Sequence, residues 1–201
     1  MKIGVLGGTF DPVHLAHLAV AEAVKAELDL AEVIFVPAGQ PWLKANNYIL
    51  AAEHRVQMVR LAIAGKPCFR LSTMEIDRPG PSYTVDTMAE LRGQIGAEDE
   101  LYFILGWDNL AELPRWREPA RIIQLCYLVA VPRPGYPAPD LTKLEGDIPG
   151  IAKRVIILDK PQMDISATEI RKRLSRGKPI DDLVPEAVAE YIRRHGLYRN
   201  Q

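Results

Sequence analysis

The sequence is poor in cysteine and lacks long hydrophobic runs. Only Cys68 and Cys126 occur among 201 residues, and each lies in an apolar stretch. This usage indicates buried thiols in a reducing compartment, because a disulfide framework or a zinc site needs more cysteines at closer spacing. No apolar run approaches the roughly 18 residues of a membrane-spanning helix, and the N-terminus lacks the apolar core of a secretory signal. We therefore expect a cytoplasmic protein.

The sequence also has no excess of charge of either sign. Lys plus Arg number 25 and Asp plus Glu number 26, which gives a net charge of −1. This balance provides no global attraction to nucleic acid or to a membrane surface, and we expect neither as a partner. A net charge near zero is compatible with a local cluster of basic groups around a small anionic ligand. It is also compatible with a homo-oligomer.

Four well-characterised catalytic motifs are absent. The chain has no G-x-G-x-x-G dinucleotide fingerprint and no G-x-x-x-x-G-K-[ST] P-loop, so hydride transfer and P-loop NTPase chemistry lose their main support. It also lacks the G-x-S-x-G nucleophile elbow and the H-E-x-x-H zinc motif.

Short apolar runs alternate with helical patterns along a chain whose length suggests one domain, with a C-terminal helical part over about 166–201. The predicted strands are Lys2–Leu6, Val33–Val36, Phe69–Ile76, Leu101–Leu105, Tyr127–Val131 and Val155–Leu158. The predicted helices are Leu15–Leu28, Arg55–Ala64, Thr84–Ile95, Ser166–Leu174 and Glu186–Arg194. This alternation predicts an α/β fold, a Rossmann-like open, mainly parallel sheet with helices on both faces. The stretch 132–150, rich in proline and glycine, is expected to be a long surface loop.

The most informative stretch is G-G-T-F-D-P-V-H-L-A-H, at residues 7–17. It joins the first predicted strand to the first predicted helix, where open α/β sheets bind ligands. Paired glycines bring backbone N–H groups close to an anion, and the helix start adds the positive end of its dipole. His14 and His17 are three residues apart and share a helical face. A Gly-Gly turn or a lone histidine is more often structural, but the compound pattern predicts a phosphate site.

A second candidate phosphate site is I-S-A-T-E-I-R, at residues 165–171. Ser166 and Glu169 have the spacing of a helix capping box, and capping alone accounts for both. It does not account for Thr168 and Arg171, whose hydroxyl and guanidinium suit phosphate oxygens.

These two stretches resemble the G-G-T-F-D-P-x-H-x-G-H and I-S-S-T-x-I-R signatures of the nucleotidyltransferase superfamily. Gly106–Asn109, Ser82–Thr84, Leu113–Trp116 and Arg133–Tyr136 match further stretches of the bacterial nicotinate-nucleotide adenylyltransferases, so the resemblance spans essentially the whole chain. It implies transfer of the adenylyl group of ATP to nicotinate mononucleotide, giving deamido-NAD and pyrophosphate. It also implies that Mg²⁺ binds together with ATP, and we assign no residue of the protein as a ligand of the metal. The alternatives are the same chemistry on nicotinamide mononucleotide or phosphopantetheine, or a non-catalytic nucleotide-binding module.

The resemblance also implies the site residues. The implied catalytic residues are His14, His17 and Arg171, and the implied ATP-binding residues are Gly8, Thr9, Phe10, Gly106, Asp108, Ile165, Ser166 and Thr168. The implied residues for the second substrate are Lys44, Tyr83, Thr84, Trp116 and Arg133. In this assignment Asp108 accepts hydrogen bonds from a ribose, Trp116 stacks on the pyridine ring, and backbone amides near Thr84 and Trp116 receive the nicotinate carboxylate. The alternatives are that Asp108 and Thr84 are helix N-caps, that Trp116 is a core aromatic, and that Lys44 is a solvated surface residue.

Overall fold

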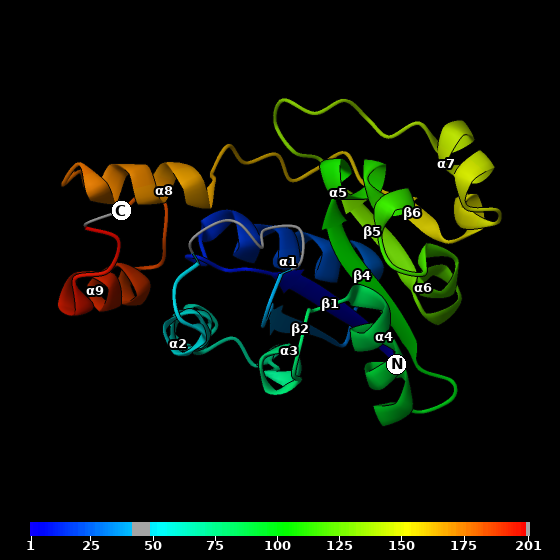
Figure 1. The fold of residues 1–201 in the computed structure, drawn as a ribbon, viewed down its shortest axis with the longest axis horizontal. Helices are drawn as coiled ribbons and strands as arrows, with labels where there is room; N and C mark the ends of the chain where they lie inside the picture. The colour runs from blue at the N-terminus through cyan, green and yellow to red at the C-terminus, as the bar shows by residue number, and fades with distance from the viewer. Residues whose placement is uncertain (42–48, 200–201) are drawn as a thin grey trace.

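The structure is a computed structural model that describes residues 1–41 and 49–199. Within this part of the chain, six parallel strands form one sheet in the order β3-β2-β1-β4-β5-β6 (Figure 1). They are β1 (Lys2–Gly8), β2 (Glu32–Pro37), β3 (Phe69–Leu71), β4 (Glu100–Gly106), β5 (Tyr127–Val131) and β6 (Val155–Ile157). The chain begins with β1 at the centre, moves outward to β3, and then places β4 on the other side of β1. The strand order therefore reverses between β1 and β4, and open parallel sheets bind ligands at such a reversal.

Apolar side chains cover both faces of the sheet. In β2, Val33 and Phe35 belong to one buried cluster, whereas Ile34 and Val36 belong to the other. Successive side chains of a strand point to opposite faces, so a continuous apolar run marks a strand that is buried on both sides. The predicted fold class, an open parallel α/β sheet, is confirmed.

Helices form a layer on each face of the sheet. One layer contains α1 (Leu15–Leu28), α2 (Ala52–Ala62), α8 (Ala167–Ser175) and α9 (Glu186–His195). The other contains α4 (Thr84–Gln94), α5 (Trp107–Ala111), α6 (Pro119–Leu125) and α7 (Leu141–Asp147). Figure 1 shows α8 and α9 together at one end of the molecule, in orange and red. The five helices predicted from the sequence are all present, with small shifts at their ends.

The predicted strand Phe69–Ile76 is wrong beyond its first three residues. Strand β3 ends at Leu71, and a short helix, α3 (Met74–Asp77), follows. The amides of Ile76 and Asp77 both donate to the carbonyl of Thr73, at 2.8 and 2.9 Å, which closes a helical turn instead of a strand ladder. Alternating apolar and polar residues over so short a stretch are compatible with either structure.

The interpretation of 132–150 as one long loop is also wrong in part, because α7 occupies its second half. Asp140 caps this helix by accepting hydrogen bonds from the amides of Thr142 and Lys143, at 3.0 and 3.1 Å. An aspartate at this position is a strong helix start, but the prolines around it concealed the signal. The short helices α5 and α6 were likewise not predicted, since each spans fewer than two turns.

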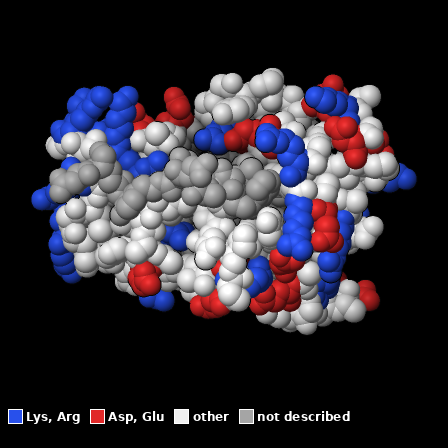
Figure 2. All heavy atoms as spheres, in the orientation of Figure 1, with Lys and Arg blue, Asp and Glu red and all other residues white. Residues whose placement is uncertain are grey.

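The surface carries charges of both signs in patches (Figure 2). Lys and Arg side chains gather over α8, whose last turn contains Lys172 and Arg173. Over residues 1–41 and 49–199, no helix is both long and apolar enough to cross a membrane. Cys68 and Cys126 are free thiols.

Candidate active site

The first motif forms a tight loop between β1 and α1. Gly8 ends the strand, and its carbonyl accepts a hydrogen bond of 2.8 Å from the amide of Ala38. Phe10 has a φ of 51°, a left-handed conformation that is uncommon for a residue other than glycine, and its ring is buried. The carbonyl of Thr9 accepts a 2.8 Å hydrogen bond from the guanidinium of Arg55. The loop is therefore held from inside the protein, and the backbone of residues 8–10 is its part nearest the carboxyl end of β1.

The two histidines of the motif lie against each other at the start of α1. His14 is the N-cap residue and His17 lies in the first turn, and their rings stack with centroids 3.7 Å apart. The amide of His14 donates to Nδ1 of His17 at 3.1 Å. Because Nδ1 accepts, the neutral His17 ring carries its proton on Nε2, which is then a hydrogen-bond donor. The predicted shared face of the two histidines is confirmed.

The charge of His14 differs from what a simple phosphate site suggests. His14 is only 6% exposed, and burial, with a smaller contribution from the nearby Arg133 guanidinium, lowers its pKa to about 4. At neutral pH the free protein therefore holds a neutral imidazole at this position. The positive charge near the loop comes instead from the guanidinium groups of Arg133 and Arg171.

The second motif reaches the first through Arg171. Its Nη1 donates to the backbone carbonyl of Asp11 at 2.7 Å, and Nη2 lies 3.5 Å from Oγ1 of Thr168. Two segments about 160 residues apart in the sequence thus meet at the start of α1. Of the two residues that capping did not explain, Arg171 contacts the loop directly and Thr168 contacts Arg171.

Ser166 performs the capping role that was the alternative to ligand binding. Its Oγ accepts from the amide of Glu169 at 3.2 Å, at the N-terminus of α8. The reciprocal half of the capping box is replaced by an ion pair between Glu169 and Arg173, at 3.7 Å. Ile165, predicted as an ATP-binding residue, packs its side chain against the apolar cluster under α1, so only its backbone remains for a ligand.

Asp108 and Arg133 are brought together at the carboxyl ends of β4 and β5, where their side chains form an ion pair. The N-cap of α5 is Gly106, and Asp108 lies in the first turn, so the capping alternative for Asp108 is wrong. A Cβ at Gly106 would collide with Oδ1 of Asp108. The glycine therefore allows the carboxylate to fold back over the end of the strand.

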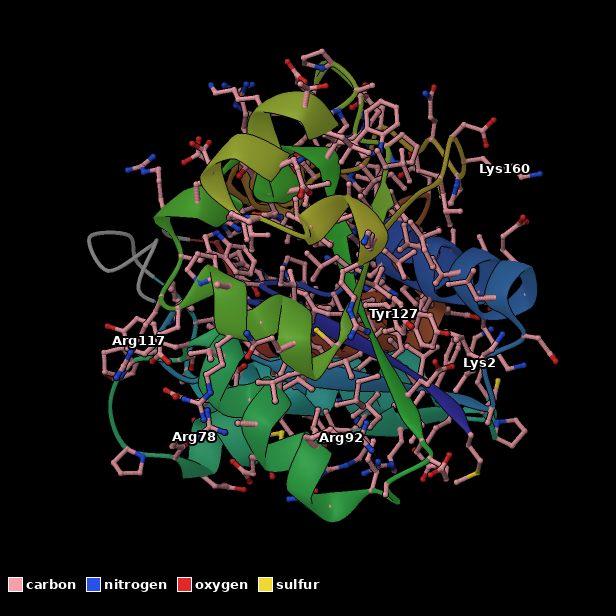
Figure 3. All side chains as sticks on the ribbon, turned by 90° about the vertical axis from the view of Figure 1, so that its right-hand side faces the viewer. Lys2, Arg78, Arg92, Arg117, Tyr127 and Lys160 are labelled. Atoms are coloured by element: carbon pink, nitrogen blue, oxygen red, sulfur yellow. The ribbon has the colours of Figure 1, made fainter. Side chains whose placement is uncertain are left out.

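Tyr83, Thr84 and Trp116 lie on the opposite helical layer. Tyr83 is the N-cap of α4 and Thr84 is its first residue, so the capping alternative for Thr84 is wrong. Trp116 packs edge-to-face on Phe103 of β4, with ring centroids 6.1 Å apart, and is partly a core aromatic as the alternative proposed. The guanidinium of Arg117, labelled in Figure 3, lies 4.8 Å from the centre of the Tyr83 ring.

The backbone amides on this side are only partly available to a carboxylate. The amide of Trp116 itself donates to the carbonyl of Leu113 at 2.9 Å. The first turn of α4, which begins at Thr84, retains backbone donors because helix starts have no intrahelical partners for them. Lys44 lies outside the described residues.

Unpartnered buried polar atoms coincide with the site. Over the described residues, four buried side-chain nitrogen or oxygen atoms lack a hydrogen-bond partner: His14 Nδ1, Trp107 Nε1, Asp108 Oδ1 and Trp116 Nε1. Native proteins leave few such atoms unpaired, and each calls for an explanation such as a ligand. Three of these atoms belong to predicted site residues, and the fourth belongs to Trp107, which precedes Asp108 in the sequence. Trp107 is a residue that the sequence reasoning did not select, although it sits inside the Gly106–Asn109 motif.

The sequence reasoning also missed three buried residues beneath the loop: Asp11, Arg55 and Tyr198. Asp11 was inside the first motif, but no role was assigned to it. Arg55 gave a weak signal, since it is a charged residue at the start of a predicted amphipathic helix. Tyr198 gave none. As for metal ligands, the described residues contain no group of three or more His, Cys, Asp or Glu side chains placed to hold an ion.

The fold and these motifs define a protein of the cytidylyltransferase-like class, whose family model matches residues 5–173. A probable nicotinate-nucleotide adenylyltransferase from Dehalococcoides mccartyi is 52% identical over 201 residues, which cover 100% of this chain and 98% of the relative. Another, from Roseiflexus sp., is 50% identical over 197 residues, or 98% of each chain. The chain belongs to the nicotinate-nucleotide adenylyltransferase family.

Solved structures share the same fold. Plasmodium falciparum nicotinic acid mononucleotide adenylyltransferase complexed with NaAD superposes with a TM-score of 0.81 at 20% identity, over 100% of this chain and 98% of that one. The same protein complexed with APC gives a TM-score of 0.79 at 20% identity, with the same coverage. At this identity the likeness speaks for the fold.

Proposed function

We propose that this protein transfers the adenylyl group of ATP to nicotinate mononucleotide, giving deamido-NAD and pyrophosphate. Membership of the nicotinate-nucleotide adenylyltransferase family supports the reaction. The observation that carries it to this site is the set of unpartnered buried atoms on His14, Trp107, Asp108 and Trp116, because a bound nucleotide would supply their missing partners.

The reaction needs no covalent intermediate on the protein. An oxygen of the 5′-phosphate of nicotinate mononucleotide attacks the α-phosphorus of ATP and forms a new P–O bond. The bond from the α-phosphorus to the bridging oxygen breaks, and that oxygen leaves with the electron pair as part of pyrophosphate. Catalysis then consists of bringing two anions together in line and stabilising the charge that develops.

We propose that the loop and the start of α1 stabilise the α-phosphate. We assign this role to Nε2–H of His17, supported by the backbone of residues 8–10 and the positive end of the α1 dipole. A neutral His14 offers a hydrogen bond without adding charge, and its pKa rises when an anion binds beside it.

We assign the leaving group to the first turns of α8. Arg171 and Thr168 come from adjacent turns of this helix, and the guanidinium reaches the loop at Asp11. A fixed guanidinium and a hydroxyl suit the oxygens of the β- and γ-phosphates and then of pyrophosphate. At the carboxyl end of β4, Asp108 is the acceptor for ribose hydroxyls, and it forms an ion pair with Arg133.

Mg²⁺ is proposed to arrive with ATP. The carboxylates nearest the site each have one oxygen paired within the protein, since Oδ2 of Asp108 pairs with Arg133 and Oδ1 of Asp11 accepts from Tyr198. An ion held by phosphate oxygens and water fits this donor set, because Mg²⁺ keeps several waters and needs few protein ligands. When bound, it would neutralise phosphate charge.

The acceptor side is proposed to lie between Tyr83, Thr84 and Trp116. The aromatic face of Trp116 suits a cationic pyridinium ring, and the first-turn amides of α4 together with Arg117 favour a carboxylate over a carboxamide. We also propose a cytoplasmic location, where the free thiols of Cys68 and Cys126 remain reduced.

Product analysis tests the proposal directly. The purified protein with ATP and Mg²⁺ would be offered nicotinate mononucleotide, nicotinamide mononucleotide or phosphopantetheine, each in a separate reaction. Deamido-NAD formed fastest supports the chemistry and the carboxylate-reading pocket. Faster formation of NAD retains the chemistry but contradicts the assignment of the acceptor side. Dephospho-CoA as the main product, or no product with any acceptor, overturns the proposal.

Two variants test the assigned residues. His17→Ala removes the donor to the α-phosphate and is expected to lower kcat at least about 100-fold. His54→Ala, which changes a histidine of α2 that contacts Tyr191 of α9, is the matched control, and its kcat should stay within about twofold of the wild type. Trp116→Ala is expected to raise the KM for nicotinate mononucleotide much more than the KM for ATP. A near-normal rate for His17→Ala contradicts the mechanism, and an unchanged KM for Trp116→Ala contradicts the pocket.

A further inference from the structure

A buried polar network lies directly beneath the loop that carries His14 and His17. Asp11 is 4% exposed, and its Oδ1 accepts a 2.7 Å hydrogen bond from the hydroxyl of Tyr198. Its Oδ2 lies 3.4 Å from the amide of Leu50. The backbone carbonyl of the same residue accepts from Arg171. One residue of the loop is therefore held at three points, by segments far from it in the sequence.

Arg55 completes this network from α2. Its side chain is 1% exposed, and Nε donates to the carbonyl of Leu50 at 2.9 Å. Its Nη1 donates at 2.8 Å to the carbonyls of both Thr9 and Ala38. Burial lowers the pKa of this guanidinium, and the neighbouring Asp11 carboxylate opposes that effect. A buried guanidinium that donates these three hydrogen bonds fixes the positions of the carbonyl groups around it.

Tyr198 joins the network from the segment that follows α9. It is 3% exposed, and its φ of 64° is in the left-handed region. A residue other than glycine adopts this backbone conformation at a cost in free energy and keeps it only where surrounding contacts impose it. Burial and the Asp11 carboxylate both raise the pKa of Tyr198, so its hydroxyl stays protonated and remains a donor to Asp11.

We propose that Tyr198 is a positioning residue for adenylyl transfer. Its hydroxyl, acting through Asp11, holds the loop in the conformation that aligns His17 and Arg171 on the ATP phosphates. The C-terminal end of the chain is then part of the nucleotide site, although Tyr198 touches no substrate. This inference rests on the proposed function for its kinetic readout, but not for its binding readout.

The test is Tyr198→Phe, which keeps the ring and removes the hydroxyl. We expect kcat to fall about tenfold and the affinity for the non-hydrolysable analogue α,β-methylene-ATP to fall at least about fivefold. The KM for nicotinate mononucleotide should stay within about twofold, because the acceptor side lies on the other helical layer. A residue that only stabilised the fold would not produce this split between the two substrates.

Tyr191→Phe is the matched control. Its hydroxyl also makes one hydrogen bond in the C-terminal region, 2.9 Å from Nδ1 of His54, and it has no bond to Asp11. We expect this variant to retain the kcat and the analogue affinity of the wild type. Thermal unfolding of both variants separates the loss of stability, which either substitution causes, from the loss of alignment.

Three results would overturn the inference. The first is a Tyr198→Phe protein that matches Tyr191→Phe in kcat and analogue affinity and differs only in melting temperature. The second is an equal loss toward both substrates. If Tyr198→Phe does not fold, Asp11→Asn keeps the side-chain size and a weaker acceptor, and wild-type affinity for the analogue in that variant is the third. Analogue binding requires no turnover, so a wild type that forms no product would contradict the proposed function and leave this test intact.

Discussion

Replacing His14 by glutamine should remove a large part of the acid sensitivity of this protein. The imidazole is 6% exposed, and its pKa is lowered to about 4 in the folded chain, first by burial and then by Arg133. In the unfolded chain its pKa returns to about 6.5. Between these two values the unfolded state binds more protons than the folded state, so the free energy of unfolding falls as the pH falls.

The size of the effect follows from the two pKa values. Each unit of pKa difference corresponds to about 1.4 kcal/mol. The free energy of unfolding of the wild type should therefore be lower than at pH 8 by about 2 kcal/mol at pH 5 and by about 3 kcal/mol at pH 4. Glutamine carries no charge at any of these pH values, so His14→Gln should lack this component. Other groups also titrate in this range, and the difference between wild type and variant removes their contribution.

Urea denaturation followed by circular dichroism at pH 8, 7, 6, 5 and 4.5 measures the free energy of unfolding of both proteins. We expect the free energy of unfolding of the wild type to fall relative to that of the variant by about 2 kcal/mol between pH 8 and pH 5. Parallel curves across the whole range would refute the reasoning. So would an NMR titration in which the His14 ring gains its proton near pH 6.5.

Three further perturbations have definite expected outcomes. Gly39→Ala places a Cβ against the backbone carbonyl of Glu75, where nothing flexible can yield, and should lower the free energy of unfolding by about 3 kcal/mol in chemical denaturation. Ser166→Ala removes the N-cap of α8 and should cost about 1 kcal/mol in the same assay; no loss would show that the cap does not contribute. Burial raises the pKa of Cys126 to about 12, so iodoacetamide at pH 8 should modify the native protein at Cys68 and spare Cys126, as peptide mass mapping would reveal.

The sheet and its main helices could be predicted because their signals are local. A buried parallel strand such as Tyr127–Val131 is a continuous apolar run, and its bounds match the prediction. Helix α1 has apolar residues at helical spacing over its full length, and its bounds match as well. Elements of one or two turns carry too few residues for a period to appear, and α3 and α5 were missed for that reason.

The candidate site was predictable as motifs but not as a network. Glycines, histidines and an arginine at fixed spacing indicate a phosphate site without reference to the rest of the chain. The hydrogen bond between Asp11 and Tyr198 joins residues 187 positions apart, and no pattern in the sequence specifies it. The neutral state of His14 has the same origin, because it depends on how deeply the folded chain buries the ring.

The candidate site contains two kinds of buried polar group, which differ in whether their hydrogen bonds are satisfied. Asp11 and Arg55 have hydrogen-bond partners at each of their charged groups, as expected for residues that fix a conformation. Asp108 and Trp116 each retain a buried atom without a partner among the described residues. Such an unsatisfied atom raises the free energy of the ligand-free protein. We expect a nucleotide that supplies hydrogen-bond partners to Asp108 and Trp116 to bind more tightly when the loop that carries His14 and His17 is already in its binding conformation. The satisfied network fixes the loop that carries His14 and His17, and this support extends as far as Tyr198.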